Sequence, residues 1–185
     1  MFEYKNVKEY PKLLVDLVRG TETKKIVGAE IGVWTGITSC LLLSEIPNLT
    51  LYMIDSWESG DGVDKTVRRL QNGRLLKMAH EEADHKTSFA HDRRFMINKF
   101  SADASKDFED GSLDFAFIDA NHQYESVKED IELWYPKVRS GGLFCGHDYG
   151  GRRRSWGVKK AVDEFALLHN YVVNDLIQVW WFTKR

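Results

Sequence analysis

Five side chains that can bind cations, accept hydrogen bonds from sugar hydroxyls or move protons lie at or just beyond the ends of short apolar segments. They are Asp55, Asp119, His122, His147 and Asp148. A carboxylate in such a place can bind a divalent cation, and an imidazole can take a proton near neutral pH. A random distribution would not collect these residue types at segment ends. We therefore predict that they share one site.

The segment 26–43 combines an apolar run, an acid and two glycines in the pattern Glu30-x-Gly32-x-x-x-Gly36. The apolar run predicts a strand, and the leucine-rich residues after Gly36 predict a helix. Glycine lacks a Cβ, so the turn between them can adopt unusual backbone angles and let a ligand approach closely. The spacing differs from that of dinucleotide-binding and phosphate-binding loops, and the acid suits a cationic ligand. A tight turn without a ligand is the alternative.

Apolar runs of strand length alternate with segments of helical periodicity along the chain. The predicted strands are 27–31, 51–54, 95–97, 113–118, 143–146, 171–173 and 178–182. The predicted helices are 36–44, 62–91, 103–108, 123–135 and 157–169, after a leading helix that ends at Gly20. Such alternation favours right-handed crossovers and a parallel sheet. We therefore predict an α/β fold, a doubly wound, mostly parallel seven-stranded sheet with a C-terminal antiparallel hairpin, whose ligands bind beyond the carboxyl ends of the strands.

Two motifs resemble those of one enzyme family. The E-x-G-x-x-x-G pattern resembles the first motif of class I S-adenosylmethionine-dependent methyltransferases. The segment 118–149 resembles a branch of small bacterial O-methyltransferase-like proteins related to macrolide-sugar O-methyltransferases, which read I-D-x-x-H-x-Y near its start and H-D-Y at its end. The resemblance covers most of the chain from about residue 25 onward and implies one methyltransferase domain with a Rossmann-like fold over residues 1–185. Two departures are Phe100, where relatives often carry an aspartate, and the charged segment 57–94, which we interpret as a helical insertion and lid.

The resemblance implies that S-adenosyl-L-methionine is the cofactor and that it binds at the ends of the first four strands. The residues implied for this role are Glu30, Gly32, Val33, Gly36, Asp55, Ser101 and Asp119. Asp55 is expected to accept hydrogen bonds from the ribose hydroxyls, and Ser101 is expected to lie near the adenine. For Asp55, a helix cap or turn acid is the alternative.

The D-x-x-H motif of these relatives supplies a metal ligand and a general base, which implies Asp119 for the first role and His122 for the second. His147-Asp148 occupies the place where relatives complete the metal site, so the implied ligands are Asp119, His147 and Asp148. Such a set is acceptable to Mg²⁺ or Mn²⁺ without selecting either. Relatives usually have an acid at the position of His147. Two alternatives therefore stay open, in which the pair is hydrogen-bonded structurally, or His147 is the base of a metal-free reaction.

The predicted function is transfer of a methyl group to a small-molecule acceptor, at a hydroxyl oxygen of a sugar or another metabolite. The sulfonium already activates the methyl group, so the protein must align donor and acceptor and remove a proton. N-methylation and a non-catalytic module that binds S-adenosylmethionine are the alternatives. The triplet at 152–154, three arginines, suits an anionic acceptor, and a solvated loop is its alternative.

Composition limits the partners and the location that we expect. The chain has 185 residues and a formal net charge of −2, which offers no electrostatic case for nucleic acid. No apolar run reaches the ~20 residues of a membrane span, so no membrane partner is expected. Two cysteines in apolar surroundings and a charged N-terminal segment predict a cytoplasmic protein. Six tryptophans and the apolar C-terminal strands leave room for a homodimer contact.

Overall fold

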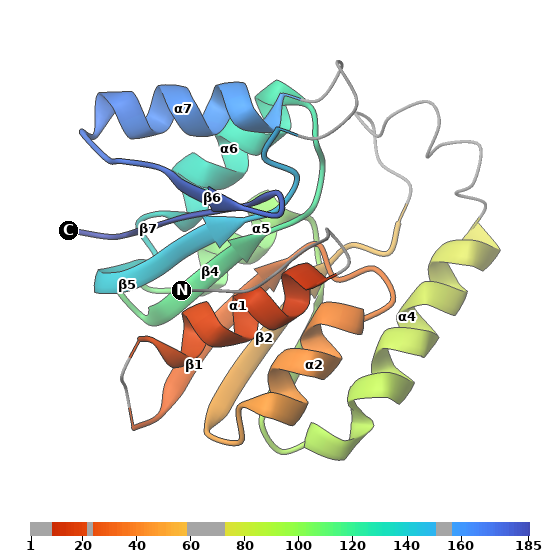
Figure 1. The fold of residues 1–185 in the computed structure, drawn as a ribbon. Helices are drawn as coiled ribbons and strands as arrows, with labels where there is room; N and C mark the ends of the chain where they lie inside the picture. Colours follow the sequence, from red (N-terminus) through yellow and green to blue (C-terminus); the bar gives the residue numbers. More distant parts are fainter. Residues whose placement is uncertain (1–8, 22–23, 59–72, 151–156) are drawn as a thin grey trace.

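The computed structural model describes residues 9–21, 24–58, 73–150 and 157–185, which form a sheet between two layers of helices (Figure 1). The strands are β1 (Ile26–Ile31), β2 (Leu49–Asp55), β3 (Arg94–Asn98), β4 (Leu113–Ile118), β5 (Val138–Gly146), β6 (Asn174–Leu176) and β7 (Val179–Thr183). The helices are α1 (Tyr10–Arg19), α2 (Ile37–Glu45), α4 (Gly73–Thr87), α5 (Ser101–Ala104), α6 (Tyr124–Trp134) and α7 (Val158–Leu168). Short 3₁₀ turns cover Ser88–Ala90 and Ser105–Asp107.

The seven strands form one sheet in the order β3-β2-β1-β4-β5-β7-β6. Strands β1 to β5 pair in parallel with their neighbours, whereas β7 is antiparallel to both β5 and β6. The predicted doubly wound sheet with a C-terminal hairpin is therefore confirmed. The strand order reverses between β1 and β4, and a ligand crevice is expected outside the carboxyl ends at such a reversal.

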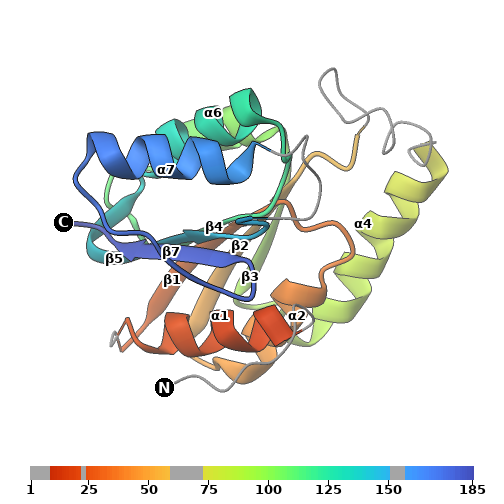
Figure 2. The ribbon, with the colours of Figure 1, turned by 45° about the horizontal axis from the view of Figure 1, so that its top comes forward.

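Strand β4 is buried along its whole length because helices cover both faces of the sheet. On one face α1, α2 and α4 pack through apolar side chains that include Leu14, Leu43 and Ala83. On the other face α6 and α7 contribute Ile131 and Val162. Figure 2 shows these two layers below and above the sheet. The covered central strands hold the polar residues at their carboxyl ends in fixed positions.

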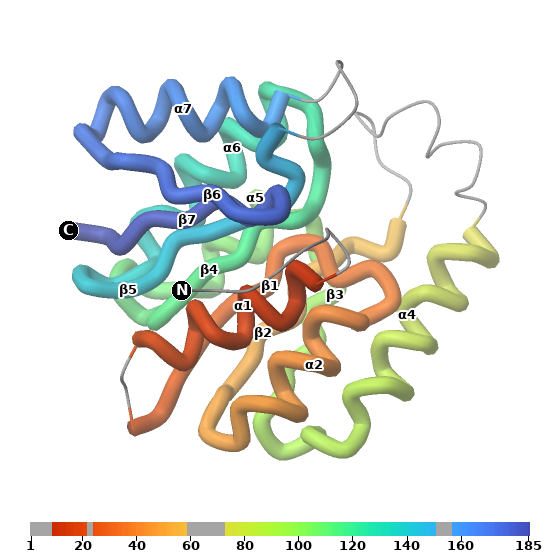
Figure 3. Tube along the Cα trace, in the orientation of Figure 1, coloured from red at the N-terminus to blue at the C-terminus, as the bar shows by residue number. Residues whose placement is uncertain are grey.

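The charged region between β2 and β3 contains α4, which runs beside α2 (Figure 3). The single helix predicted over 62–91 is shorter in the structure, since it ends at Thr87 and a 3₁₀ turn follows. Residues 59–72 lie outside the described residues, so the lid stays a prediction. No helix in the described ranges is both long and apolar enough to cross a lipid bilayer.

The strand predicted at 171–173 is wrong, since those residues are irregular and β6 begins only at Asn174. The register of this hairpin is set by its turn, in which Leu176 pairs with Val179 across two residues. Those residues, Ile177 and Gln178, have φ of 46° and 70°. Two-residue hairpin loops favour such angles and usually carry glycine or asparagine there. Neither glycine nor asparagine occurs at positions 177 and 178, so the sequence carries no turn signal there.

Candidate active site

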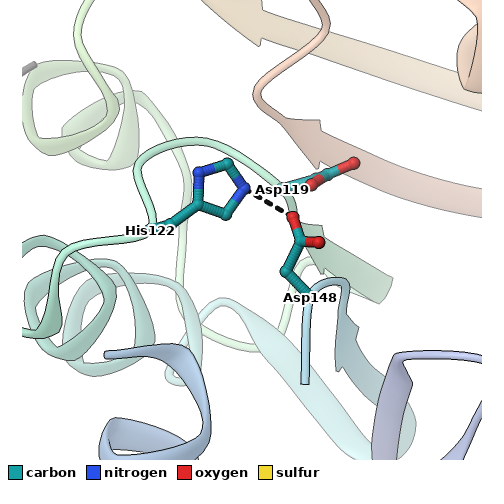
Figure 4. Close-up of side chains that lie close together, drawn as sticks. All are labelled: Asp119, His122 and Asp148. Carbon is teal, nitrogen blue, oxygen red and sulfur yellow. Dashed lines mark ion pairs between the residues drawn. The ribbon is translucent and has the colours of Figure 1, made fainter. Parts of the chain in front are cut away.

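The carboxyl ends of β4 and β5 bring three polar side chains together from separate parts of the sequence (Figure 4). Asp119, His122 and Asp148 each offer one ligand atom, and these atoms lie within 4.8 Å of one another. Nε2 of His122 is 2.5 Å from Oδ2 of Asp148. The D-x-x-H motif and the acid after β5 therefore meet in one cluster, as the sequence predicted.

Backbone hydrogen bonds that extend the sheet beyond its strands place two residues of the site. The N–H of Asp119 donates to the carbonyl of Ile31 at 2.8 Å, which holds the end of β4 against the end of β1. The N–H of His147 donates to the carbonyl of Ile118 at 3.0 Å, which holds the end of β5 against β4. These bonds are the physical reason that strand-end residues distant in sequence share one site.

Loop contacts place the other two residues of the site. The side chain of Asn121 accepts a hydrogen bond from the N–H of Gln123 at 2.9 Å, which turns the chain into α6. The carbonyl of His122 accepts one from the N–H of Gly157 at 2.8 Å, which ties the start of α7 to this loop. Asp148 has a φ of 59°, a left-handed conformation that is uncommon for a residue with a Cβ. Such conformations persist where the surroundings enforce them, and they concentrate at functional sites.

His147 lies beside the cluster and contacts both of its carboxylates. Its Nδ1 is 3.4 Å from Oδ2 of Asp148 and 3.7 Å from Oδ1 of Asp119. Burial alone would lower the pKa of this imidazole, but the two carboxylates outweigh that effect and raise it to about 9. His147 therefore carries a proton at neutral pH. The histidine whose ligand atom lies within 4.8 Å of those of Asp119 and Asp148 is His122. A metal-ligand role for His147 stays a prediction.

The pKa values of the two carboxylates in the cluster are shifted in opposite directions. Burial raises the pKa of Asp119, and the contact with His147 only partly opposes that effect. Burial also acts to raise the pKa of Asp148, but the contacts with His122 and His147 lower it well below its usual range. Asp148 is therefore firmly ionised. Two carboxylates and one imidazole form a ligand set that fits Mg²⁺ or Mn²⁺, and the protonated His147 competes with a cation for the same oxygens.

Glu30 faces into the protein at the end of β1. Its side chain is 1% exposed, and Oε2 accepts a hydrogen bond from the hydroxyl of Ser39 in α2. Burial, opposed in part by the Ser39 bond, raises the pKa of Glu30 to about 8. The acid is therefore neutral at pH 7 and does not present the negative charge that was expected to attract a cationic ligand. Contact of Glu30 with the cofactor stays a prediction.

The two motif glycines allow close approach between parts of the protein. A Cβ on Gly32, which has a φ of 95°, would lie 2.3 Å from the carbonyl oxygen of Asp119. A Cβ on Gly36, which has a φ of 71°, would lie 2.9 Å from Cα of Ala83 in α4. Both positions require glycine for packing and backbone conformation. A role of either glycine in cofactor binding stays a prediction.

Asp55 at the end of β2 organises two loops. Oδ2 accepts hydrogen bonds from the N–H groups of Val33 and Trp34, at 3.0 and 2.8 Å, and Oδ1 accepts one from Trp57 at 2.8 Å. The turn-acid role weighed from the sequence is therefore present. Oδ1 accepts a single backbone N–H and retains capacity for a hydroxyl donor, because each carboxylate oxygen has two lone pairs. The ribose contact of Asp55 and the cofactor contact of Val33 stay predictions.

Ser101 begins α5 at the carboxyl side of β3, and its hydroxyl is engaged within the protein. Oγ donates a hydrogen bond to Oδ1 of Asp130 and accepts one of 2.8 Å from Nε1 of Trp134. Asp130 is buried, and burial raises its pKa to about 7 against the opposing Ser101 bond. The pairing of Asp130 with Ser101 was not predicted from the sequence. A lone acid on the apolar side of the 123–135 helix was the available signal. Contact of Ser101 with adenine stays a prediction.

Tyr10 in the leading helix α1 is a neighbour of the site that the sequence did not predict. Its ring stacks on the imidazole of His147, with centroids 4.0 Å apart and planes 26° apart. Its hydroxyl shares a 2.9 Å hydrogen bond with the hydroxyl of Thr38 in α2. A tyrosine at the start of an apolar helix is an ambiguous signal, since such residues usually complete a core.

Residues 29–149 match a family model described as a methyltransferase domain. Two curated proteins are similar in sequence. Uncharacterized protein y4gI of Sinorhizobium fredii is 31% identical over 93 residues, which are 48% of this chain and 10% of that protein. Uncharacterized protein R132 of Acanthamoeba polyphaga mimivirus is 27% identical over 154 residues, which are 82% of this chain and 64% of that protein. This chain thus spans less than two thirds of either relative's length.

Solved structures share the fold at low sequence identity. The O-methyltransferase NovP superposes with a TM-score of 0.66 at 20% identity, over 95% of this chain and 78% of NovP. A putative caffeoyl-CoA O-methyltransferase from Staphylococcus aureus gives 0.69 at 16% identity, over 100% and 85% of the two chains. A putative rRNA-methylase from Clostridium thermocellum gives 0.65 at 14% identity, over 100% of both. The last two names cite different acceptors, caffeoyl-CoA and rRNA, so the shared fold does not identify an acceptor.

Proposed function

Since this chain belongs to the methyltransferase domain family, we propose that it transfers the methyl group of S-adenosylmethionine to a hydroxyl oxygen of a small molecule. The observation that carries the proposal is the cluster of Asp119, His122 and Asp148 at the carboxyl ends of β4 and β5. A hydroxyl must lose its proton to become a good nucleophile, so its methylation benefits from a positioned base or a cation. The cluster can supply either one. This chemistry favours oxygen over nitrogen as the acceptor atom.

His122 is the proposed general base. Oδ2 of Asp148 lies 2.5 Å from Nε2 of His122, so the carboxylate is placed next to the ring. His122 would take the proton of the acceptor hydroxyl, and the ionised Asp148 would stabilise the imidazolium that results. His147 is the rival base, but its ring nitrogen Nδ1 is directed at the two aspartates. We therefore propose that His122 removes the proton from the acceptor. His147 would partly neutralise the two carboxylates of the cluster.

The residues proposed to hold S-adenosylmethionine lie at the ends of β1, β2 and β4. Asp55 retains hydrogen-bonding capacity on Oδ1 for the ribose, and Asp119 lies where a carboxylate can face a cationic donor. An activated methyl group is the chemistry that this cofactor supplies when bound. The contribution of the chain is to align that group with the acceptor oxygen and to exclude water from the contact.

A divalent cation is the second element of the proposal. Asp119, His122 and Asp148 would hold it, because their ligand atoms are already gathered within 4.8 Å. Lewis acidity toward the acceptor oxygen is the chemistry that such a cation supplies when bound. In that case His122 would be a ligand, and the reaction would depend less on a separate base. The metal-dependent and metal-free versions are separated by experiment.

The test is a transfer assay in which S-adenosylmethionine labelled in its methyl group is incubated with the protein and a metabolite extract. Parallel reactions contain Mn²⁺ or a chelator. We expect label in small molecules, with the methylated product stable to mild base as an ether is. His85→Ala is the matched control for His122→Ala, because His85 is an exposed histidine on α4. The control should retain wild-type transfer.

The outcomes separate the alternatives. Loss of transfer with the chelator supports the metal-dependent version, and unchanged transfer supports the metal-free one. Label on a nitrogen of the product would replace O-methylation by N-methylation. Tight binding of S-adenosylhomocysteine without transfer to any component of the extract would contradict the proposed activity in favour of a binding module.

A further inference from the structure

We propose that Tyr10, the first residue of α1, is a positioning residue of the methyl-transfer site that fixes the plane of the His147 imidazole between Asp119 and Asp148. This inference rests on the proposed function for its effect on turnover. Tyr10 precedes the segment 29–149 that matches the family model, so the contribution comes from outside the matched region. The leading helix would thereby complete the site in addition to covering the sheet.

The contacts of His147 leave its ring plane dependent on Tyr10. On one edge, Nδ1 faces the two carboxylates at 3.4 and 3.7 Å. Nε2 is buried and has no hydrogen-bond partner among the described residues. On its face, the ring stacks against Tyr10 at 4.0 Å between centroids. Rotation of an imidazole about its Cβ–Cγ bond is broadly permitted, so the stack on Tyr10 adds resistance to rotation of the ring.

Tyr10 is itself held from three directions and can act as a fixed surface. Its hydroxyl shares a hydrogen bond with the hydroxyl of Thr38, which is 3% exposed in the first turn of α2. Its ring also stacks on Phe117 of β4, with centroids 6.3 Å apart. Leu13 and Leu14 anchor the following turn of α1, since both are fully buried. The ring therefore joins α1, α2 and β4 at the point where His147 lies.

Loss of the Tyr10 ring should change the position of His122, the proposed base. If the imidazole turns, its Nδ1 moves away from Asp119 and Asp148, which lie 3.7 and 3.4 Å from it. Asp148 then loses a contact that holds it in place, and because it lies 2.5 Å from Nε2 of His122, the position of His122 changes with it. Displacement of a catalytic group by about 1 Å lowers rates on the order of 100-fold. Residues proposed to bind the adenosine, such as Asp55, lie two strands away in the sheet and should keep their positions.

The test compares Tyr10→Leu and Tyr10→Phe with a matched control, Tyr52→Leu. Tyr52 is also a half-buried tyrosine that contacts two rings, since it stacks on Phe95 and meets Phe108 edge-on, but it lies on β2 away from the cluster. Three measurements are made on each full-length variant: the midpoint of thermal unfolding, the apparent kcat and KM for S-adenosylmethionine in the extract assay, and the histidine proton NMR spectrum. The His147 resonance is assigned by its loss in His147→Gln.

We expect Tyr10→Leu to lower the apparent kcat by about 10- to 100-fold, to leave KM for S-adenosylmethionine within about twofold, and to shift the His147 resonance by loss of the ring current. Tyr10→Phe should restore most of the turnover and the resonance. Tyr52→Leu should lose a similar amount of thermal stability but keep the wild-type turnover and the wild-type His147 resonance. Equal losses of kcat in Tyr10→Phe and Tyr10→Leu would overturn the inference in favour of a role for the hydroxyl. An unmoved His147 resonance in Tyr10→Leu would also overturn it, and this measurement stands even if the wild type transfers no methyl group.

Discussion

Glu30→Gln should make the protein more stable than the wild type at alkaline pH, because the folded chain holds this acid in its neutral form. The side chain is 1% exposed, and its pKa is about 8 against an ordinary value of 4.5. Burial is the main cause, and the carboxylates of Asp119 and Asp55 add to it. A glutamine has nearly the same shape and can keep the contact with Ser39. The variant therefore removes the ionisation while it preserves the packing.

The magnitude follows from proton linkage. A pKa of about 8 against 4.5, at about 1.4 kcal/mol for each pH unit, makes ionisation of Glu30 cost about 5 kcal/mol in the folded chain. Between these two values the folded state binds more protons than the unfolded state, so the wild type loses stability as the pH rises through this window. Most of the loss, about 4 kcal/mol, falls between pH 5 and pH 9. That is a large part of the stability of a typical domain, about 5–15 kcal/mol.

The assay is urea unfolding of the ligand-free wild type and Glu30→Gln at pH values from about 5 to 9. The difference in free energy of unfolding should grow in favour of the variant as the pH rises and should level off above the folded pKa. Glu45→Gln is the matched control, because Glu45 is an exposed glutamate at the end of α2 that forms an ion pair with Arg19. Its difference should stay small at every pH. A Glu30→Gln difference that does not grow with pH would refute the conclusion that Glu30 is neutral in the folded chain.

Three further predictions concern the site. Gly32→Val should destabilise the fold by about 2–4 kcal/mol, since its Cβ would meet the carbonyl of Asp119. The control is Gly111→Val, because Gly111 also has a positive φ but a Cβ there would meet only Cα of Arg139, at an ordinary contact distance of 3.9 Å. Thermal unfolding should show a smaller loss of stability in Gly111→Val, and equal losses would argue against the clash. Asp55→Ala should weaken binding of S-adenosylhomocysteine by about 1.5–3 kcal/mol in calorimetry on the folded variant, and a smaller loss would leave Asp55 as a turn acid. His122→Ala should lower turnover by about 10²–10⁴-fold with cofactor binding spared, whereas full activity would transfer the role of base to another group.

The sequence by itself determined the class of fold and the edge of the sheet at which the site lies. Both depend on local patterns. The uniformly apolar residues 113–118 predicted a strand covered on both faces, and β4 is buried along its length. Polar residues directly after such strands must collect at one edge, because parallel strands end together. Asp119, His122 and Asp148 were predicted to share a site on that ground, and the structure brings them together.

Local patterns also explain where the sequence-based interpretation was wrong. The valines at 172 and 173 suggested a strand on propensity, but the hairpin register depends on a turn with left-handed residues at Ile177 and Gln178. The motif glycines predicted close approach of a ligand, and that stays a prediction, but the packing of Gly32 against the backbone of Asp119 was not foreseen. Both contacts are made with residues that sequence spacing does not identify.

Only the tertiary structure decided which histidine joins the two aspartates, what charge each group carries, and which distant residues support them. His122 and His147 are both plausible ligands by position, and only the distances place His122 in the cluster and His147 beside it. The neutral Glu30 follows from its burial beneath α2, and Tyr10 reaches His147 only because α1 packs back across the sheet. The physical reason is that hydrophobic periodicity is encoded locally in the chain. Distances, burial and the electrostatic effects that depend on them arise only when remote segments pack together.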